Sequence, residues 1–426
     1  MMNAIQAVFI AAGDSSRFWP LNNGSHKTEL SLFGRPILYW TAKGLVDQGI
    51  EEIIVVCKKN STIPVLTSFQ ELKADVKFVF QQEALGTGDA LWQAKDFIQG
   101  PFFLVWPNKI EAGEIAKEIL EKQREGAEVV LCGTRAENLQ DFGIFQMEGD
   151  KVLSIIEKPE PGKEPSKIRR AGIELLPEDF FSAYEQLPFH HATDIIDALN
   201  LLIQKKKTQL IVKEQLSSLK YPWDAFALMD ALFKSRSFTP EKAATAKIAS
   251  TAVVGKDVYV GENVKIGEYT VIEGPAYIGE DCEIGSHNVL RGPVNLEKEV
   301  RTGAFCEIKN SIVQEGTHFH SGYVGNSIIG KNCRLGAGII TGNKRLDRGA
   351  ISSVVKGKKQ STGLSSFGTV MGDNTRVGVS CSIMPGVLIG SHCMIGPATV
   401  VSENLESHSL LYAEQTKIVK KKGEHI

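Results

Sequence analysis

The residues with the clearest chemical potential form a short loop near the start of the chain. Ala11-Ala12-Gly13 continues as DSSR, ending in Arg17, and Lys27 lies ten residues further on. A loop of small residues between a strand and a helix exposes backbone N–H groups that bind phosphate oxygens. Arg17 and Lys27 add the positive charge that stabilises a pentavalent phosphorus. The segment therefore predicts a phosphate-binding loop suited to transfer at phosphorus.

The elements that must position this loop alternate in character over roughly the first 235 residues. Short, β-branched apolar runs predict strands at 7–10, 53–57, 102–106 and 129–132. Amphipathic stretches between them predict helices at 37–48 and 115–124. Such alternation is typical of a mostly parallel, doubly wound α/β sheet, in which ligands bind beyond the carboxyl ends of the strands.

The period of the sequence changes in its second half. Every sixth residue from Ile248 to Leu296 is aliphatic, and the rhythm resumes from Met371 to Val401. Neither an α-helix nor an alternating strand has this period, whereas a β-helix of hexapeptide repeats does. Five of the seven cysteines lie two residues before such an aliphatic, on the same inward side of a strand, so we expect them in the core. The pattern resembles the left-handed parallel β-helix of hexapeptide-repeat acyltransferases.

Composition excludes several classes of protein. The chain of 426 residues carries Lys+Arg 48 against Asp+Glu 50, a net charge of -2, which argues against a nucleic-acid-coating protein. No apolar run reaches the ~18 residues of a membrane span. The seven cysteines form no CxxC pair, which disfavours a structural zinc or redox motif. We read the first residues as a buried strand rather than a signal peptide, and we expect a cytoplasmic protein that binds neither membrane nor nucleic acid.

The whole N-terminal string resembles the signature of sugar-1-phosphate nucleotidylyltransferases. Its further matches, in the family's order, are Gln81 with Leu85-Gly86-Thr87-Gly88, Phe142-Gly143, Glu157-Lys158-Pro159, Ala171-Gly172-Ile173 and Thr193-Asp194. The resemblance implies that a sugar-1-phosphate attacks the α-phosphorus of a nucleoside triphosphate and that pyrophosphate leaves, with Mg²⁺ bridging the phosphates. It assigns catalysis to Arg17 and Lys27.

The resemblance also implies the binding residues. The nucleotide would be bound by Ala11, Ala12, Gly13, Gln81, Gly86 and Thr87, and the sugar by Gly143, Glu157 and Thr193. At the two metal-ligand positions this chain departs from the family, because it has Asn108 after Pro107 where the family has Asp after Gly, and Ser218 just before the YPWD segment. Mg²⁺ prefers at least one carboxylate, for which Asp224 or Asp89 are the alternatives. The sequence leaves open whether the nucleotidylyl site is active or impaired.

A second set of residues lies between the two regular runs of hexapeptides. The segments around Lys309, His320, Tyr323 and Asn343 resemble the acetyltransferase centre of bifunctional UDP-N-acetylglucosamine pyrophosphorylase/glucosamine-1-phosphate acetyltransferases, closest to their archaeal-type branch. This resemblance implies that His320 is the catalytic base, since imidazole titrates near neutral pH. It assigns the acetyltransferase substrate to Lys309, Tyr323 and Asn343, and acetyl-CoA as the co-substrate.

These observations predict a Rossmann-like nucleotidyltransferase domain followed by a β-helix. We expect the first domain at 1–235, a linker at 236–245, the β-helix at 246–410 with a projecting polar loop at 342–370, and a basic tail at 411–426. The expected function is synthesis of UDP-N-acetylglucosamine by a homotrimer. Two alternatives stay open: a thymidylyl- or guanylyltransferase for another hexose-1-phosphate with a purely structural β-helix, and a catalytically inactive sugar-nucleotide sensor or scaffold.

Overall fold

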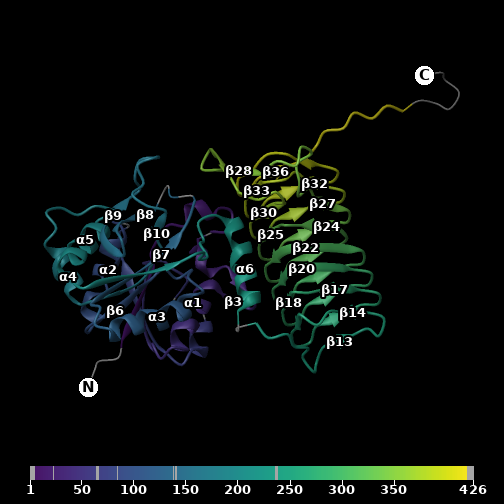
Figure 1. Ribbon diagram of the computed structural model, residues 1–426. Helices are drawn as coiled ribbons and strands as arrows, with labels where there is room; N and C mark the ends of the chain where they lie inside the picture. Colours follow the sequence, from purple (N-terminus) through teal and green to yellow (C-terminus); the bar gives the residue numbers. More distant parts are fainter. Residues whose placement is uncertain are drawn as a thin grey trace. The chain divides into compact units, whose positions relative to one another are not determined.

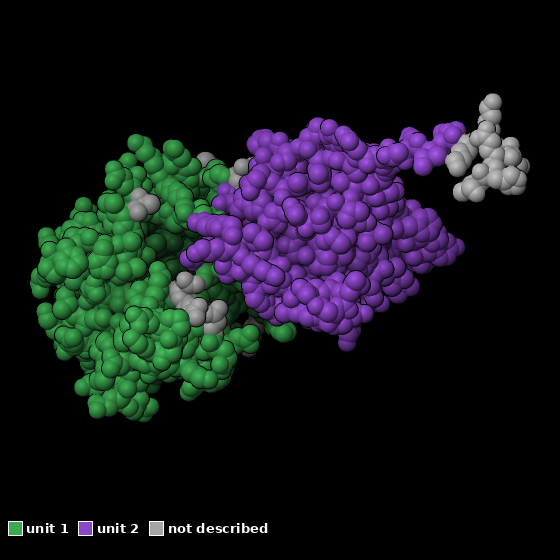
Figure 2. All heavy atoms as spheres, turned by 90° about the horizontal axis from the view of Figure 1, so that it is seen from above, with its two compact units in different colours: residues 1–16, 24–235 green, residues 17–23, 236–426 purple. Residues whose placement is uncertain are grey.

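The computed structural model describes residues 5–22, 24–63, 67–83, 85–137, 139, 142–235 and 238–419. The chain divides into two compact units, one of residues 1–16 and 24–235 and the other of residues 17–23 and 236–426, and each is described by itself (Figures 1 and 2). Within the described ranges, no helix combines the length and the apolar character needed to cross a bilayer.

The first unit is built on one ten-stranded sheet, with the strand order β5-β4-β1-β6-β11-β7-β10-β8-β9 and β12 paired to β7. Its strands are β1 (Gln6–Ala11), β4 (Glu52–Lys58), β5 (Asp75–Gln81), β6 (Phe102–Val105), β7 (Val129–Arg135), β8 (Gly143–Glu148), β9 (Lys151–Glu157), β10 (Ile168–Arg170), β11 (Ile173–Leu176) and β12 (Thr208–Lys213). All four strands predicted from the sequence are present.

The expectation of a mostly parallel sheet holds for only part of it. Strands β5, β4, β1 and β6 are parallel, as are β7 and β12. Strand β11 enters between β6 and β7 and is antiparallel to both, and β10, β8 and β9 continue with antiparallel pairs. The first β-branched runs are separated by helices and therefore pair in parallel, whereas β8 and β9 are joined by a tight turn that permits only an antiparallel pair.

Helices cover both faces of this sheet (Figure 1). They are α1 (Ile37–Val46), α2 (Thr87–Trp92), α3 (Ala112–Arg124), α4 (Asp179–Glu185) and α5 (Ile195–Lys205). A further helix, α6 (Ala225–Lys234), belongs to neither of the two apolar clusters that join helices to the sheet. One apolar cluster joins α1 and α3 to one face, and a second joins α2, α4 and α5 to the other. Helix α3 buries Ile115, Ala116 and Ile119, which share one side of a 3.6-residue helix. The unit is thus a doubly wound α/β fold, as predicted.

The second unit is a stack of short parallel strands (Figure 1). One sheet contains β13 (Lys247–Ile248), β16 (Lys265–Ile266), β19 (Glu283–Ile284), β21 (Arg301–Thr302), β23 (His318–Phe319), β26 (Arg334–Leu335), β31 (Arg376–Val377), β34 (Met394–Ile395) and β36 (Leu410–Leu411). A branched sheet contains β14 (Val253–Val254), β15 (Val258–Val260), β17 (Val271–Glu273), β18 (Ala276–Ile278), β20 (Val289–Leu296), β22 (Cys306–Val313), β24 (Gly322–Gly325), β25 (Ile328–Ile329), β27 (Ile339–Thr341), β30 (Thr369–Met371), β32 (Ser382–Ile383), β33 (Val387–Ile389) and β35 (Val400–Val401).

Strand register confirms the hexapeptide prediction. Lys247 pairs with Lys265 and Val253 with Val271, so each strand pairs with the strand that follows it by one coil of three hexapeptides. The aliphatic series forms one continuous apolar core, with Ile248 and Val254 partly buried at its end. All seven cysteines of the chain are free and buried, including the five predicted inside the β-helix. Stacking the coils therefore buries a single core, as in other solenoids.

The middle of the β-helix departs from this regularity. The coil that joins Cys306 to its partner Gly322 is shorter than three hexapeptides, whereas the coil that joins Ile328 to its partner Val370 is much longer. The extra length of the second coil locates the insertion predicted at 342–370 within a single turn of the β-helix.

The insertion is more ordered than the polar loop that its sequence predicts. It contains an antiparallel hairpin of β28 (Ser352–Val355) and β29 (Lys358–Ser361). Ser353 Oγ donates to Gly386 O at 2.7 Å, and Asn404 Nδ2 donates to Val354 O at 2.9 Å. The side chain of Val355 is buried as well, so the alternation of strand side chains places one face of the hairpin against the β-helix.

Candidate functional sites

The predicted phosphate loop begins where β1 ends in the middle of the first sheet. Ala11 and Ala12 are buried, and Gly13 is exposed at the carboxyl end of the strand. The loop is tied to the predicted catalytic lysine, because the backbone N–H of Lys27 donates to Ser15 Oγ at 3.0 Å. The structure therefore brings the small-residue loop and Lys27 together.

Lys27 follows a histidine that caps its short helix. The His26 Nδ1 atom lies 2.7 Å from Thr28 Oγ1, and the His26 backbone N–H donates to Glu29 Oε1 at 2.7 Å. Burial lowers the pKa of His26 to about 3, and the positive charges of Lys27 and Lys58 contribute to this shift. The imidazole is therefore neutral at physiological pH, so it adds no charge beside Lys27.

The other predicted catalytic residue, Arg17, is the last residue of the loop. It is exposed in the single 3₁₀ turn Ser16–Phe18, and residues 17–23 belong to the second compact unit. Its role at the phosphates stays a prediction.

Gln81, the predicted base-reading residue, ends β5 and is buried. Its Nε2 group donates to Gly86 O at 3.1 Å and to Asp89 Oδ2 at 2.7 Å. Gly86 has a φ of 119°, and a Cβ there would lie 2.5 Å from Ala192 O, so only glycine fits. Both Nε2 protons are thus committed within the protein, and the Gln81 amide presents its oxygen as the acceptor for a ligand.

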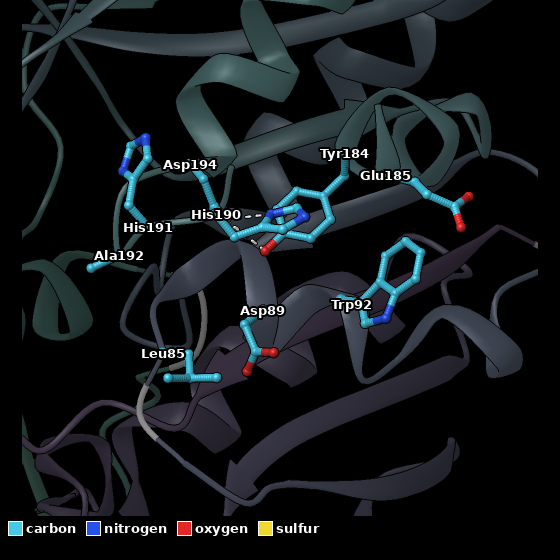
Figure 3. A pocket seen from close by; sticks show the side chains of 9 residues that line it. All are labelled: Leu85, Asp89, Trp92, Tyr184, Glu185, His190, His191, Ala192 and Asp194. Atoms are coloured by element: carbon cyan, nitrogen blue, oxygen red, sulfur yellow. Dashed lines mark hydrogen bonds and ion pairs between the residues drawn. The ribbon is translucent and has the colours of Figure 1, made fainter. Parts of the chain in front are cut away.

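A pocket adjoins this base-reading corner (Figure 3). Its volume is about 640 Å³, and its lining residues are Leu85, Asp89, Trp92, Tyr184, Glu185, His190, His191, Ala192 and Asp194. The Tyr184 hydroxyl donates to Asp194 Oδ2 at 2.7 Å. Burial raises the pKa of Tyr184, and the Asp194 carboxylate adds to this increase. The predicted sugar-binding residue Thr193 lies between two of the lining residues, with its backbone N–H donating to His191 Nδ1 at 3.3 Å.

The other two predicted sugar-binding residues face each other across a pair of strands. Gly143 starts β8, Glu157 ends β9, and the two are paired in the ladder. A Cβ at Gly143 would lie 3.1 Å from Glu157 Oε2, so glycine at this position leaves space for the Glu157 carboxylate. Nearby, the guanidinium carbon of Arg169 lies over the Phe142 ring, 4.2 Å from the ring centroid.

The two expected metal-ligand positions lie in a region rich in positive charge. Asn108 is buried, and the adjacent Lys109 donates its Nζ to Ser217 O at 2.8 Å, next to Ser218. Burial lowers the pKa of Lys109 to about 8, the Glu111 carboxylate raises it, and the Arg169 and Lys27 charges lower it. Across the described ranges, no cluster of three or more His, Cys, Asp or Glu side chains is arranged to hold a metal ion.

The carboxylates proposed as substitute metal ligands already have partners. Asp224 accepts the backbone N–H groups of Lys220 at 2.7 Å and Tyr221 at 2.8 Å, and its burial raises its pKa. Asp89 accepts from Gln81, and its other oxygen accepts from Gln93 Nε2 at 3.2 Å. Glu111 differs from both, because its Oε1 atom accepts the backbone N–H of Ser217 at 2.8 Å while its Oε2 atom is buried without a hydrogen-bond partner. A carboxylate oxygen of the kind that Mg²⁺ prefers is therefore present beside Ser218.

In the second unit, His320 occupies a corner at which the neighbouring coils have glycine. The strand pairs Thr302–Phe319, Phe319–Leu335 and Leu335–Val377 place His320 in one row with Gly303, Gly336 and Gly378. A Cβ at Gly303 would clash with the backbone oxygen of His320, which shows how closely the coils approach there. His320 is exposed, so the corner presents an imidazole where its neighbours in the row have no side chain.

The three residues predicted to bind the acetyltransferase substrate lie on the face that starts just beyond this corner. Asn343 Nδ2 donates to Tyr323 Oη at 2.9 Å and to Asn326 Oδ1 at 2.7 Å. Lys309 pairs with Gly325, where a Cβ would clash with the Tyr323 hydroxyl. Burial raises the pKa of Tyr323, so its hydroxyl keeps its proton. The structure thus gathers Tyr323, Asn343 and the strand position of Lys309.

Sequence reasoning missed the roles of two residues. Asp89 accepts a hydrogen bond from Gln81 rather than lying free as a metal ligand, and Lys109 donates to the carbonyl oxygen of Ser217 beside the expected metal position Ser218. Asp89 lies eight residues after Gln81, a spacing that carries no local signal, and Lys109 meets a residue 108 positions away. Only the order of the strands reveals the second contact.

A doubly wound sheet with a phosphate loop, followed by a hexapeptide β-helix with an exposed histidine, defines a two-domain transferase. Residues 6–234 match the nucleotidyl transferase family, and the chain belongs to that family. Residues 257–292 and 368–403 match the bacterial transferase hexapeptide repeats. The chain is therefore an enzyme of the nucleotidyltransferase class, as predicted.

Similar proteins share both domains. The bifunctional protein GlmU of Methanococcus maripaludis strain C7 is 30% identical over 98% of this chain and 100% of its own length. A bifunctional sugar-1-phosphate nucleotidylyltransferase/acetyltransferase of Sulfurisphaera tokodaii is 28% identical over 94% of this chain and 98% of its own. The predicted resemblance to archaeal bifunctional proteins is thereby confirmed.

A solved structure supports the fold of the first unit. A protein described as a glucose-1-phosphate thymidylyltransferase from Bacillus anthracis, in complex with a sucrose, matches 56% of this chain and 98% of that chain. The TM-score is 0.50 and the sequence identity is 20%, so this likeness shows the fold alone.

Proposed function

We propose that this enzyme makes UDP-N-acetylglucosamine in two steps. The β-helix acetylates glucosamine-1-phosphate with acetyl-CoA, and the first domain then transfers a uridylyl group from UTP to the N-acetylglucosamine-1-phosphate. The observation that carries the proposal is the match to bifunctional relatives across both domains, covering 98% of this chain and 100% of the Methanococcus maripaludis protein.

In the nucleotidylyl step, a phosphate oxygen of the sugar-1-phosphate forms a new bond to the α-phosphorus. The bond from that phosphorus to the bridging oxygen of the β-phosphate breaks, and pyrophosphate leaves with its electron pair. The loop of Ala11, Ala12 and Gly13 would bind the phosphates, with charge from Lys27 and Arg17. Gly86, Thr87 and the Gln81 oxygen would bind the base, and an acceptor at that place suits the N3–H of uracil or thymine.

In the acetyl step, His320 would remove a proton from the ammonium group of glucosamine-1-phosphate. The free amine then attacks the thioester carbonyl of acetyl-CoA, an N–C bond forms, and the C–S bond breaks as the thiol leaves. Tyr323, Asn343 and Lys309 lie on the strand face beside this corner and would bind the sugar phosphate. Lys356 and Lys358 are exposed around the turn of the hairpin and would meet further phosphate groups.

Two parallel assays with the full chain test this proposal. Pyrophosphate release is measured with UTP, dTTP or GTP and a panel of sugar-1-phosphates, and thiol release is measured with acetyl-CoA and glucosamine-1-phosphate. We expect both products, with UTP preferred. Pyrophosphate without thiol would support the alternative in which the β-helix is structural, and neither product would support the sensor.

We further propose that the enzyme is a cytoplasmic homotrimer assembled through its β-helices, with the domain boundaries expected above. Support comes from an exposed row of stacked aromatic rings along one edge of the β-helix. In this row the ring centroid of His287 lies 5.1 Å from the ring centroid of Tyr269 and 5.1 Å from that of Phe305. Tyr269 is 59% exposed and Phe305 is 68% exposed, a pattern suited to an interface between copies. A light-scattering mass near that of one chain would contradict this assembly.

A further inference from the structure

A line of outward-facing side chains on the β-helix changes its charge pattern close to the His320 corner. Strand register places six of them in line, in the order Lys265, Glu283, Arg301, His318, Arg334 and Arg376. Each faces outward, because the residue that follows it in its strand is buried. Over the first three the signs alternate, with Glu283 lying 2.8 Å from the Lys265 ammonium and 3.9 Å from Arg301 Nε. Beyond Arg301 the line continues without a carboxylate as far as Arg376.

The four residues from Arg301 to Arg376 form a cationic row. Successive strands lie ~4.8 Å apart, and like charges directly opposite each other destabilise a sheet. His318 responds to this environment, because burial lowers its pKa, the Arg334 and Arg301 charges lower it further, and the Glu283 carboxylate acts in the opposite direction. The row therefore holds three arginines in line against their mutual repulsion, which an anion bound from solution would relieve.

Two arginines of the cationic row are suited to bind such an anion. Arg334 is held in place, since its Nη1 group donates to Gly316 O at 2.7 Å and to Cys333 O at 3.0 Å. Arg376 is exposed, and its side chain has no hydrogen bond or ion pair with any residue that the structure describes. The planar guanidinium fork binds two oxygens of a phosphate at once. The row thus offers one fixed and one free guanidinium to a phosphate group.

The cationic row ends one face of the β-helix just before the His320 corner. His318 and His320 belong to the same coil, and the His320 backbone N–H donates to Leu335 O at 2.9 Å, one residue after Arg334. The three residues predicted to bind the acetyltransferase substrate lie on the face that starts beyond this corner. The corner histidine is therefore flanked on one side by the predicted substrate residues and on the other by the arginines.

We propose that the cationic row binds a phosphate group of a substrate of acetyl transfer, through Arg334 and Arg376. The inference rests on the proposed acetyltransferase function and deepens it. The phosphate belongs either to the amino-sugar phosphate or to acetyl-CoA, because both substrates carry this chemistry. Binding it beside the corner holds that substrate near the imidazole of His320.

Steady-state thiol release with the full chain tests this inference and identifies the source of the phosphate. The parent and Arg376→Gln are compared with glucosamine-1-phosphate against glucosamine, and with acetyl-CoA against S-acetylpantetheine. We expect the KM for one phosphorylated substrate to rise at least tenfold with kcat within twofold, and kcat/KM for its phosphate-free counterpart to stay unchanged. The substrate whose KM rises is the source of the phosphate. Unchanged KM values for both substrates, or an equal loss with the phosphate-free counterpart, would overturn the inference.

Two further variants separate a phosphate site from a general effect of charge. Lys247→Gln is the matched control, because Lys247 is exposed in the same sheet, pairs in register with Lys265 and should leave both KM values unchanged. An equal rise of KM in this control would overturn the inference. Arg376→Glu puts a carboxylate beside Arg334, so we expect a thermal midpoint at or above that of the parent together with a larger rise of KM than in Arg376→Gln. A lower midpoint would overturn the repulsion from which the site is inferred.

The outcomes separate this inference from the proposed function. Thiol release with unchanged KM values in Arg376→Gln overturns the inference and leaves acetyl transfer standing. If the parent releases no thiol, the proposed acetyl transfer fails, and calorimetric titration with coenzyme A, glucosamine-1-phosphate and inorganic pyrophosphate decides on the phosphate site. Binding that Arg376→Gln weakens at least tenfold supports the site, whereas equal affinity or no binding overturns it.

Discussion

The histidine beside Lys27 makes the phosphate loop sensitive to acid. Folding places His26 in a buried position next to Lys27, which lowers its pKa from 6.5 to about 3. Below pH 6.5 the unfolded chain therefore binds a proton that the folded chain refuses, so the free energy of unfolding decreases as the pH falls toward 3. The stabilisation is fully present above pH 6.5.

The size of the effect follows from the difference between the pH of the measurement and the pKa of His26 in the unfolded chain. At pH 5 the unfolded imidazole is largely protonated, and one pKa unit corresponds to about 1.4 kcal/mol, so the loss attributable to His26 is about 2 kcal/mol. His26→Gln cannot be protonated and keeps a hydrogen-bonding side chain. We therefore expect the variant to lose about 2 kcal/mol less than the parent between pH 7.5 and pH 5.

Urea unfolding followed by tryptophan fluorescence measures this difference in the relevant domain. Four of the five tryptophans lie in the first unit, and residues 236–426 contain none. Carboxylates that titrate in the same range are common to both proteins and cancel in the comparison. The control is His191→Gln, whose half-exposed ring pairs with Asp197 and should change the result by less than about 1 kcal/mol. Equal pH dependence in the parent and His26→Gln would refute the reasoning.

Three further changes probe the two sites. We expect His320→Gln to slow thiol release from acetyl-CoA by about 10²- to 10⁴-fold and to leave pyrophosphate release unchanged; an equal loss of both activities would contradict a local role. Asp89→Leu frees the Gln81 amide to rotate, so the preference in kcat/KM for UTP over CTP should fall by about tenfold, and an unchanged preference would show that Asp89 does not orient Gln81. Gly88→Ala would place a methyl group in steric conflict with Asp194 Oδ1, and we expect a loss of about 1–3 kcal/mol in the urea unfolding of the first domain; an unchanged midpoint would contradict that packing.

The sequence by itself determined the architecture of the β-helix. A coil of three hexapeptides must turn one aliphatic inward from each side, so the period of six appears directly in the order of residues. The first strands and the phosphate loop were equally visible, because apolar runs and small-residue loops are local features. The expectation failed where pairing depends on partners far along the chain, as for β11, which enters antiparallel between β6 and β7.

Only the tertiary structure decided the chemistry of the metal positions and of the corner histidine. The sequence shows Asn108 and Ser218 as two isolated departures, whereas the folded chain brings Lys27 and Lys109 to the carbonyls on both sides of Ser218. The glycine row that His320 interrupts is likewise invisible until the coils are stacked, since each of its members comes from a different coil. Charge repulsion and steric exclusion act over a few ångströms, and those distances exist only after the strands have taken their order in the sheets.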